Sequence, residues 1–154
     1  GSSDVVKDVL GKLNVRSIFW KVAIKPGKPI YFGTRRKKLV FGLPGNPVAA
    51  QLGFQLFVKP ALLRMMGAKA AEPLALTACL TQDLKKKPGR LEFVRGVLIH
   101  DTEGKLRVRP TRGRDSHMMG GLAAANCLIQ FPEDAEYLSA GSDVTLLLLY
   151  WGVQ

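Results

Sequence analysis

The sequence predicts an α/β segment followed by a small all-β domain that resembles a barrel or sandwich. The chain has 154 residues, 47% of them apolar, which is enough to bury a core in one or two small domains. The first half alternates strand-like runs, Gly/Pro loops and helix-like runs, as α/β layers do. The second half holds short strand-like runs separated by turn residues, as small barrels do. We place the boundary in the featureless stretch 68–73, so the domains cover 1–70 and 74–154.

The first half is expected to open with a helix over 4–13, because apolar residues recur there at helical spacing and Ser3 or Asp4 can cap the first turn. Proline and glycine at 26–29 then enforce a loop between strand-like runs. The expected elements after the helix are a strand over 18–24, a short extended piece over 30–32, a charged turn over 35–38 and a buried strand over 39–42.

A long helix is expected from Pro47 to Met66. Asn46 is a good N-cap, and proline suits the first helical position. Gly67 is a typical residue just past a helix end. Pro60 predicts a kink or break near 58–59, because it removes one backbone donor.

The second half is expected to be built from strands. Apolar and β-branched residues form runs bounded by Gly, Pro, Asp and Ser. A short helix is expected over 118–126. The expected strands are 74–81, 91–99, 106–110, 127–131 and 143–150, and the expected turns are 87–89, 101–104 and 140–142.

The positive charge is concentrated in the first half. The net charge is +11, with 13 Lys/Arg and three Asp/Glu in residues 1–73 against ten and nine in residues 74–154. This asymmetry indicates an anionic ligand or partner for the first half: nucleic acid, a phosphorylated small molecule or an oxyanion.

Several function classes find no support in the composition. No apolar run approaches the roughly 18 residues that span a bilayer, and the polar N-terminus is unlike a signal peptide. Cys79 and Cys127 lack metal-type spacing and are expected to be buried thiols in a reducing cytosol. With only two histidines and no Walker pattern, a zinc site and a P-loop are not expected. The basic runs 35–38 and 85–87 lack interleaved aromatics, so they favour solvated turns over nucleic-acid binding.

Two stretches could hold an anion. The loop 42–47 lies between a strand and a helix start, where glycine admits close backbone approach and free N–H groups favour negative charge. Many such loops are only structural, but a strand's carboxyl end in an α/β sheet favours a ligand site. The stretch 21–29 places Lys21 and Lys25 on one strand face, with Lys28 in the loop. These lysines suit phosphate or an oxyanion, or else form a solvated face.

These residues resemble the molybdopterin molybdenumtransferase family, which includes bacterial MoeA and the E domain of gephyrin. The resemblance rests on Lys-Val-Ala-Ile-Lys-Pro-Gly-Lys-Pro at 21–29 and Gly-Leu-Pro-Gly-Asn-Pro-Val at 42–48. It continues through 57–67, 89–96 and 116–126, so it covers essentially the whole chain. It implies the end of a molybdopterin-binding three-layer α/β domain followed by the small β-barrel domain, about the C-terminal 40% of a member. Gly1 to Asp4 resembles the end of a family loop, whereas Ala49 stands where many relatives have serine.

The implied reaction is the Mg²⁺-dependent insertion of molybdate into adenylylated molybdopterin with release of AMP. The resemblance also implies a cytoplasmic homodimer that acts on small anionic substrates, and the molybdopterin adenylyltransferase is a candidate partner. The lysines would offset anionic charge, Asp4 would help to hold Mg²⁺, and the loop 44–47 would wall the molybdate pocket. The implied catalytic residues are Asp4 (also the metal ligand), Lys21, Lys25, Pro44 and Pro47, and the implied cofactor-binding residues are Gly27, Lys28, Gly42, Gly45, Asn46, Arg90, Arg95 and Ser116.

Two other readings stay open at this point. One is a non-enzymatic binding or scaffold module of the gephyrin type, and the other is a basic nucleic-acid-binding domain. Binding of a receptor peptide would favour the scaffold, and a steep salt dependence of affinity for DNA or RNA would favour the nucleic-acid reading.

Overall fold

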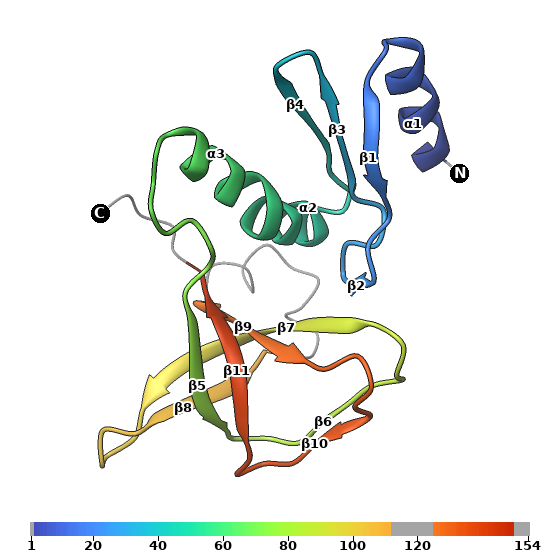
Figure 1. Cartoon of the computed structure of the whole chain (residues 1–154). Helices are drawn as coiled ribbons and strands as arrows, with labels where there is room; N and C mark the ends of the chain where they lie inside the picture. The colour runs from blue at the N-terminus through green and yellow to red at the C-terminus, as the bar shows by residue number, and fades with distance from the viewer. Residues whose placement is uncertain (1, 112–124, 150–154) are drawn as a thin grey trace. The chain divides into compact units, whose positions relative to one another are not determined.

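The chain contains two compact units, residues 1–72 and residues 73–154 (Figure 1). The computed structural model describes residues 2–111 and 125–149, with side chains from residue 5 onward. In the part of the chain that is described, no helix is long and apolar enough to cross a membrane. The first unit contains α1 (Ser2–Lys12), β1 (Arg16–Trp20), β2 (Ile24–Lys25), β3 (Tyr31–Arg35), β4 (Lys38–Gly42), α2 (Pro47–Gly53), the π-helical turn η1 (Phe54–Val58) and α3 (Lys59–Met65).

The first unit is a three-layer α/β structure around an antiparallel sheet in the order β1-β3-β4. On one face, Phe32 of the central strand packs between Phe19 and Phe41, with ring centroids 5.6 and 4.8 Å away. Phe57 of η1 covers this face, 5.8 Å from Phe19. The other face carries Tyr31, and α1 lies on this side (Figure 1). The expected α/β layer is therefore confirmed.

Three local expectations for the first unit are wrong. The strand predicted over 18–24 ends at Trp20, because Lys21 has a positive φ of 69° that ends the extended backbone. The strand predicted as buried is an edge strand, β4, with no fully buried residue. The first helix begins at Ser2, so the residues proposed as its caps lie inside its first turn.

The helical rod from Pro47 to Met65 is interrupted by a π-helical turn at 54–58. The N–H of Lys59 bonds back to the carbonyl of Phe54, and Pro60, which has no N–H, follows directly. The predicted kink near 58–59 thus takes the form of one wide turn. The helix stops at Gly67, as predicted: its φ is +85°, its N–H bonds the Arg64 carbonyl, and the next N–H bonds that of Leu63.

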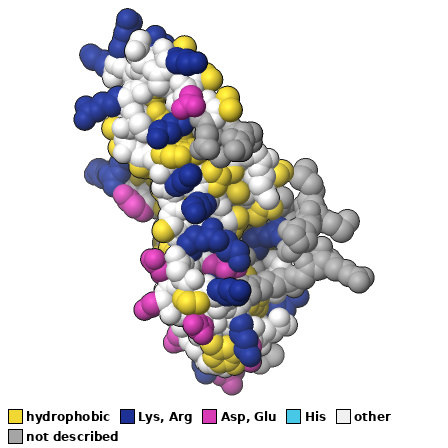
Figure 2. Space-filling model, turned by 90° about the vertical axis from the view of Figure 1, so that its right-hand side faces the viewer, with side chains coloured by type: hydrophobic (Ala, Val, Ile, Leu, Met, Phe, Trp, Pro, Cys, Tyr) yellow, Lys and Arg dark blue, Asp and Glu magenta, His cyan; other side chains and the backbone are white. Residues whose placement is uncertain are grey.

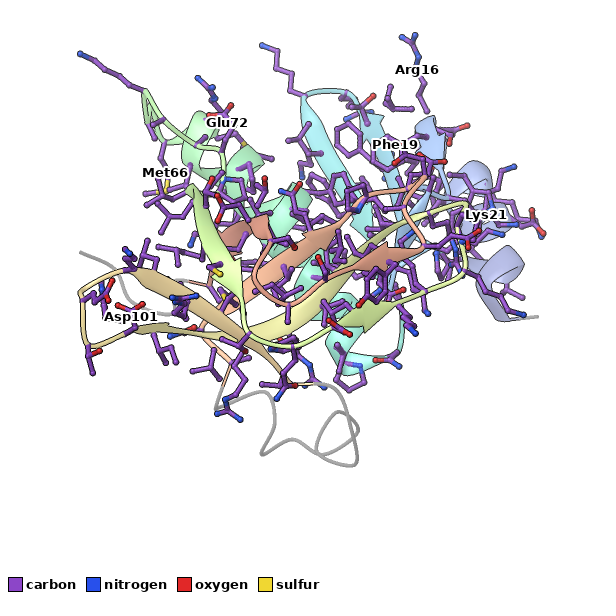
Figure 3. The ribbon with its side chains drawn as sticks, turned by 90° about the horizontal axis from the view of Figure 1, so that it is seen from below. Arg16, Phe19, Lys21, Met66, Glu72 and Asp101 are labelled. Atoms are coloured by element: carbon purple, nitrogen blue, oxygen red, sulfur yellow. The ribbon has the colours of Figure 1, made fainter. Side chains whose placement is uncertain are left out.

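A short ion pair ties the segment after α3 back to that helix. Arg64 donates to Glu72 over 2.6 Å and to the Lys69 carbonyl over 3.2 Å. The Arg64 hydrogen bond holds the pKa of the Glu72 carboxyl down at about 2. Glu72 and Met66 mark this end of the unit in Figure 3.

The second unit is a closed five-stranded barrel. Its strands follow the order β7-β8-β5-β11-β9, and pairing of β7 with β9 closes the ring. The expected barrel-like domain is confirmed. The strands of the ring are β5 (Ala75–Leu80), β7 (Leu91–His100), β8 (Leu106–Pro110), β9 (Cys127–Phe131) and β11 (Asp143–Leu148).

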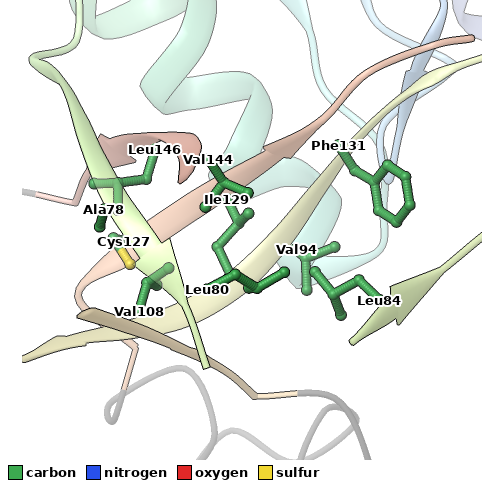
Figure 4. Close-up of a cluster of buried hydrophobic side chains, with 10 residues drawn as sticks. All are labelled: Ala78, Leu80, Leu84, Val94, Val108, Cys127, Ile129, Phe131, Val144 and Leu146. Atoms are coloured by element: carbon green, nitrogen blue, oxygen red, sulfur yellow. The ribbon is translucent and has the colours of Figure 1, made fainter. Parts of the chain in front are cut away.

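Alternate residues of these strands fill the barrel, as the period of two requires (Figure 4). Val108, Ile129 and Leu146 are fully buried at its centre. Gly96 leaves room there, since a Cβ at this position would lie 2.9 Å from the side chain of Val108. The complete cluster is Ala78, Leu80, Leu84, Val94, Val108, Cys127, Ile129, Phe131, Val144 and Leu146.

The sequence predicted the five barrel strands to within two residues at each described end. It missed the two-residue strands β6 (Leu84–Lys85) and β10 (Tyr137–Leu138), which pair outside the ring and are too short to show a pattern. The helix expected over 118–126 lies mostly outside the described residues, and residues 125–126 are not helical. Cys127 is buried as expected, whereas Cys79 is only partly buried because its side chain points out of the barrel toward Arg107.

Candidate functional site

The three lysines of 21–28 lie on one small loop between β1 and β3. Two backbone bonds close its base, from the Lys21 N–H to the Ile30 carbonyl and from the Val22 N–H to the Lys28 carbonyl, both 3.0 Å. Because β1 ends at Trp20, Lys21 and Lys25 do not share a strand face as predicted. Instead, the chain turn gathers all three exposed lysines around one loop (Lys21 is labelled in Figure 3).

The turn of this loop requires glycine. Gly27 has a φ of +115°, which favours glycine, and the peptide bond from Lys25 to Pro26 is cis. A Cβ at Gly27 would also lie 3.3 Å from the side chain of Ile24. The sequence predicted Gly27 as a ligand contact, and its geometry shows that the turn itself requires it.

A hollow of about 450 Å³ opens beside this loop in the first unit. Trp20 and Pro29, the outer neighbours of Lys21 and Lys28, both line it, so the two ends of the lysine loop border the hollow. Among the described side chains that line it, none is charged. The lining residues are Val6, Trp20, Pro29, Tyr31, Gly42, Leu43, Pro44 and Gly45.

Residues 42–45 of the Gly/Pro loop line the hollow, but one reason for expecting an anion at this loop is wrong. The side-chain oxygen of Asn46 accepts from the N–H groups of Val48 (2.9 Å) and Ala49 (3.3 Å). These N–H groups at the helix start are therefore occupied rather than free for a ligand. Asn46 and Pro47 fix the shape of the loop, with Pro47 at the first helical position as predicted.

Two glycines of this loop differ in what a side chain at their position would contact. A Cβ at Gly42 would come within 3.0 Å of the Tyr31 Cβ, so glycine lets the aromatic side chain lie against β4. A Cβ at Gly45 would meet nothing within 4 Å, so packing does not require glycine there.

The charge around the loop is strongly one-sided. Between Asp8 and Glu72 the sequence holds 12 Lys/Arg and no carboxylate. Figure 2 shows Lys and Arg side chains over the upper part of the view, which is the first unit, with few acidic ones among them. The Lys21 ammonium lies 5.6 Å from the centre of the Trp20 ring, at cation–π distance. The unit can thus attract an anion to the rim of an uncharged hollow.

The remaining predicted site residues lie outside the lysine loop and the Gly/Pro loop. Arg90 and Arg95 belong to the second unit: Arg90 is exposed, and the Arg95 carbonyl accepts two bonds from Thr111. Ser116 lies outside the described residues, and so does the side chain of Asp4. Among the side chains that are described, no three of His, Cys, Asp or Glu converge as a metal site would require.

Sequence reasoning missed the residues that line the hollow from the sheet. Trp20 and Tyr31 were assigned to strand structure only, while Pro29 was counted with the lysine stretch 21–29. A signal was present, since an aromatic residue directly precedes Lys21 and a proline directly follows Lys28. What the sequence could not show is that hydrogen bonds across the loop base bring these flanks together.

Comparisons with known proteins find matches along nearly the whole chain. Residues 1–64 match the family "Probable molybdopterin binding domain", and residues 77–149 match "MoeA C-terminal region (domain IV)". The molybdopterin molybdenumtransferase of Haemophilus influenzae is 37% identical over 95% of this chain, and that of Bacillus subtilis is 34% identical over 97%. A molybdopterin biosynthesis moeA protein of Pyrococcus horikoshii superposes with a TM-score of 0.78 at 29% identity, covering 95% of this chain and 35% of that one. The chain spans only 36% and 34% of the lengths of the two curated relatives.

Proposed function

This chain belongs to the molybdopterin molybdenumtransferase family, and on that premise we propose that it serves molybdenum cofactor biosynthesis as part of a molybdenumtransferase. The observation that supports this most directly lies in the first unit. A hydrogen-bonded loop with three exposed lysines borders a hollow whose described lining is uncharged, within the segment that matches a molybdopterin-binding domain.

The reaction we propose is the insertion of molybdate into adenylylated molybdopterin, with release of AMP. Both substrates are anions, and ammonium groups gathered on one loop offset such charge. Lys21, Lys25 and Lys28 hold the phosphate and oxyanion groups in this proposal. Pro44 and Pro47 hold the backbone of the Gly/Pro loop 42–47 in place. Asn46 caps α2 and does not contact the ligand in this proposal.

The second unit and the metal have more limited roles in the proposal. Arg90, Arg95 and Ser116 stay predictions as contacts to the pterin or the nucleotide phosphate, and no step depends on them here. The described side chains do not by themselves fit Mg²⁺, because they supply no cluster of oxygen ligands. Asp4 as a Mg²⁺ ligand stays a prediction, and no step depends on it here.

Calorimetry with molybdate and with molybdopterin-AMP tests the proposal. We expect Lys28→Ala and Lys25→Ala to weaken binding of either ligand, because each removes a positive charge from the loop. Lys37→Ala is the matched control: it removes the same charge from the β3–β4 hairpin turn in the same unit and should leave affinity nearly unchanged. Absence of binding to both ligands, or equal losses in all three variants, would contradict the proposed site.

A further inference from the structure

The end of the first sheet that lies away from the hollow is strongly basic. Tyr31 and Gly42, which line the hollow, pair at one end of the β3–β4 hairpin. Arg35 and Lys38 pair at the other end, about 13 Å of extended chain further along β3. Figure 1 shows the start of β1 beside this turn, because β1 and β3 also pair there. The exposed cations gathered here, which we call the basic end, are Arg16, Arg35, Arg36, Lys37 and Lys38.

These charges oppose the fold that holds them. Arg35 and Lys38 lie directly opposite each other across the hairpin, and like charges in such a pair are destabilising. Residues 9–71 contain no Asp or Glu, so neither the strands nor the turns between them supply a negative charge to offset the repulsion. Folding of the hairpin therefore gives no reason for four consecutive cations at 35–38.

The backbone of the turn adds a second destabilising feature. Arg36 is the first residue of the two-residue turn and has a φ of 54°, a conformation that hairpin turns usually give to glycine or asparagine. The neighbouring turn between α1 and β1 follows the usual preference, because its residue with positive φ is Asn14. Strained residues of this kind occur at sites where the side chain has a role. An arginine at this position thus indicates that its charge is used.

The surroundings of the basic end favour a polypeptide partner over a nucleic acid. Arg16 and Leu39 both lie opposite Thr34, so the three side chains share one face of the sheet. Leu39 is 39% exposed, which places an apolar contact beside the cations. Such a mixture of arginine and exposed apolar surface is typical of protein interfaces. Residues 34–39 include no aromatic side chain on which a base could stack.

We propose that the basic end is a docking surface for an acidic segment of a partner protein. Carboxylates of the segment pair with the arginines, which offer a carboxylate two parallel donors, and with the two lysines between which they lie. The bound negative charge relieves the repulsion between Arg35 and Lys38. An apolar side chain of the segment covers Leu39. Because the lysine loop lies at the other end of the sheet, substrate and partner can bind at the same time.

The first test measures fluorescence anisotropy of a labelled peptide, in which glutamates alternate with leucine and serine, on the full 154-residue chain. The peptide should bind, and its affinity should fall at least about fivefold from low to physiological salt because the contacts are exposed ion pairs. The same peptide with glutamine in place of glutamate should not bind. Equal binding of the two peptides would overturn the proposal. Tighter binding of a DNA duplex of matched charge than of the acidic peptide would replace the protein partner by a nucleic acid and overturn it too.

The second test changes Arg36 in two ways. Arg36→Gly should weaken peptide binding at least about threefold and yet raise the midpoint of thermal unfolding by about 2–5 °C, because glycine adopts the positive φ without strain. Arg36→Glu should weaken binding about tenfold, because it reverses the charge. A merely structural role for Arg36 would move the midpoint and leave peptide affinity unchanged, and that result would overturn the docking surface.

Matched controls separate the basic end from general charge and from the substrate loop. Lys69→Ala removes an exposed cation elsewhere in the same unit and should leave peptide affinity and the midpoint of unfolding unchanged. Molybdate in excess should not displace the peptide, and Lys28→Ala should retain peptide binding. A loss in Lys69→Ala equal to that in Arg36→Gly would mean that the peptide senses net charge only. Displacement by molybdate would mean that the peptide occupies the lysine loop. Either result would contradict the proposal, and neither would bear on the proposed function.

Discussion

Gly33 shows how a single residue limits the packing of the first unit. A Cβ at this position of the central strand would lie 2.8 Å from the Arg16 carbonyl oxygen and 2.8 Å from a Val15 methyl. The neighbouring atom is backbone and cannot rotate away, so we expect Gly33→Ala to lower the free energy of unfolding by about 1–3 kcal/mol. Urea unfolding followed by circular dichroism measures this.

The matched control for Gly33 lies in α1. Gly11 has nothing within 4 Å of its would-be Cβ and lies inside a helix. Gly11→Ala should therefore raise stability by about 0.5–1 kcal/mol, because alanine loses less backbone entropy in a helix. Equal effects of the two changes would refute the packing argument.

The two cysteines should differ in reactivity. Burial in the barrel raises the pKa of the Cys127 thiol to about 12, whereas Cys79 is partly exposed on the outside. At pH 8 the solution lies far below the Cys127 pKa, so that thiol stays protonated and unreactive in the folded chain. We expect iodoacetamide to label Cys79 first, as peptide mass spectrometry would show.

A variant separates reactivity from general unfolding in the cysteine experiment. Cys79→Ser should leave a chain that is labelled slowly under native conditions and quickly in urea. Rapid native labelling of Cys79→Ser at Cys127 would show that the barrel does not protect its core.

The site was predictable at the residue scale only in part. The spacing of the lysines and the Gly/Pro loop marked two segments that the structure places beside the hollow, because these motifs are local. The reason that Lys21 joins the loop is a positive φ of 69°, which a lysine rarely adopts and which no local pattern signals. The tryptophan beside it was therefore assigned to a strand face and missed.

At the scale of elements, the cap of α2 decides the shape of the Gly/Pro loop. Asn46→Ala removes two hydrogen bonds to the first turn, and we expect a loss of about 1 kcal/mol of stability. Asn46→Ser should retain most of it, since serine is also a good cap. Thermal unfolding of the three proteins checks this, and an alanine variant as stable as the serine variant would argue that the cap bonds contribute nothing.

The ends of the helical rod from Pro47 to Met65 were predicted about as closely as those of the barrel strands. Asn46, Pro47 and Gly67 each act through backbone chemistry within a few residues, so the sequence places the helix ends well. Whether β4 is buried or an edge depends on what pairs with it, which local pattern does not contain. The same holds for β6 and β10, whose two-residue pairing has no periodic signal.

At the scale of the whole molecule, the first unit carries most of the positive charge, and each unit has buried residues of its own. The two-part fold was predictable because the change from helix-and-loop to strand-and-turn patterning is visible along the chain. Patterning alone left both a barrel and a sandwich open, because closure needs β7 to pair with both β8 and β9 and β5 to pair in parallel with β8. Such pairings join residues far apart in sequence and depend on register across several strands.

The buried cluster of the second unit leads to a last prediction. All ten members of the buried barrel cluster come from residues 73–154, and Ile129 among them is fully buried. Ile129→Ala should cost about 2–5 kcal/mol in the barrel, because the cavity is enclosed on all sides. Val5→Ala, at a side chain 61% exposed, should change stability by less than about 0.5 kcal/mol. Hydrogen exchange followed by mass spectrometry should show the loss of protection in Ile129→Ala concentrated in the β5, β7, β8, β9 and β11 peptides, with the Phe19–Phe32–Phe41 sheet of the first unit retaining its protection. A uniform loss across both units would mean that they unfold as one cooperative body, and the barrel core would then support the lysine loop as well.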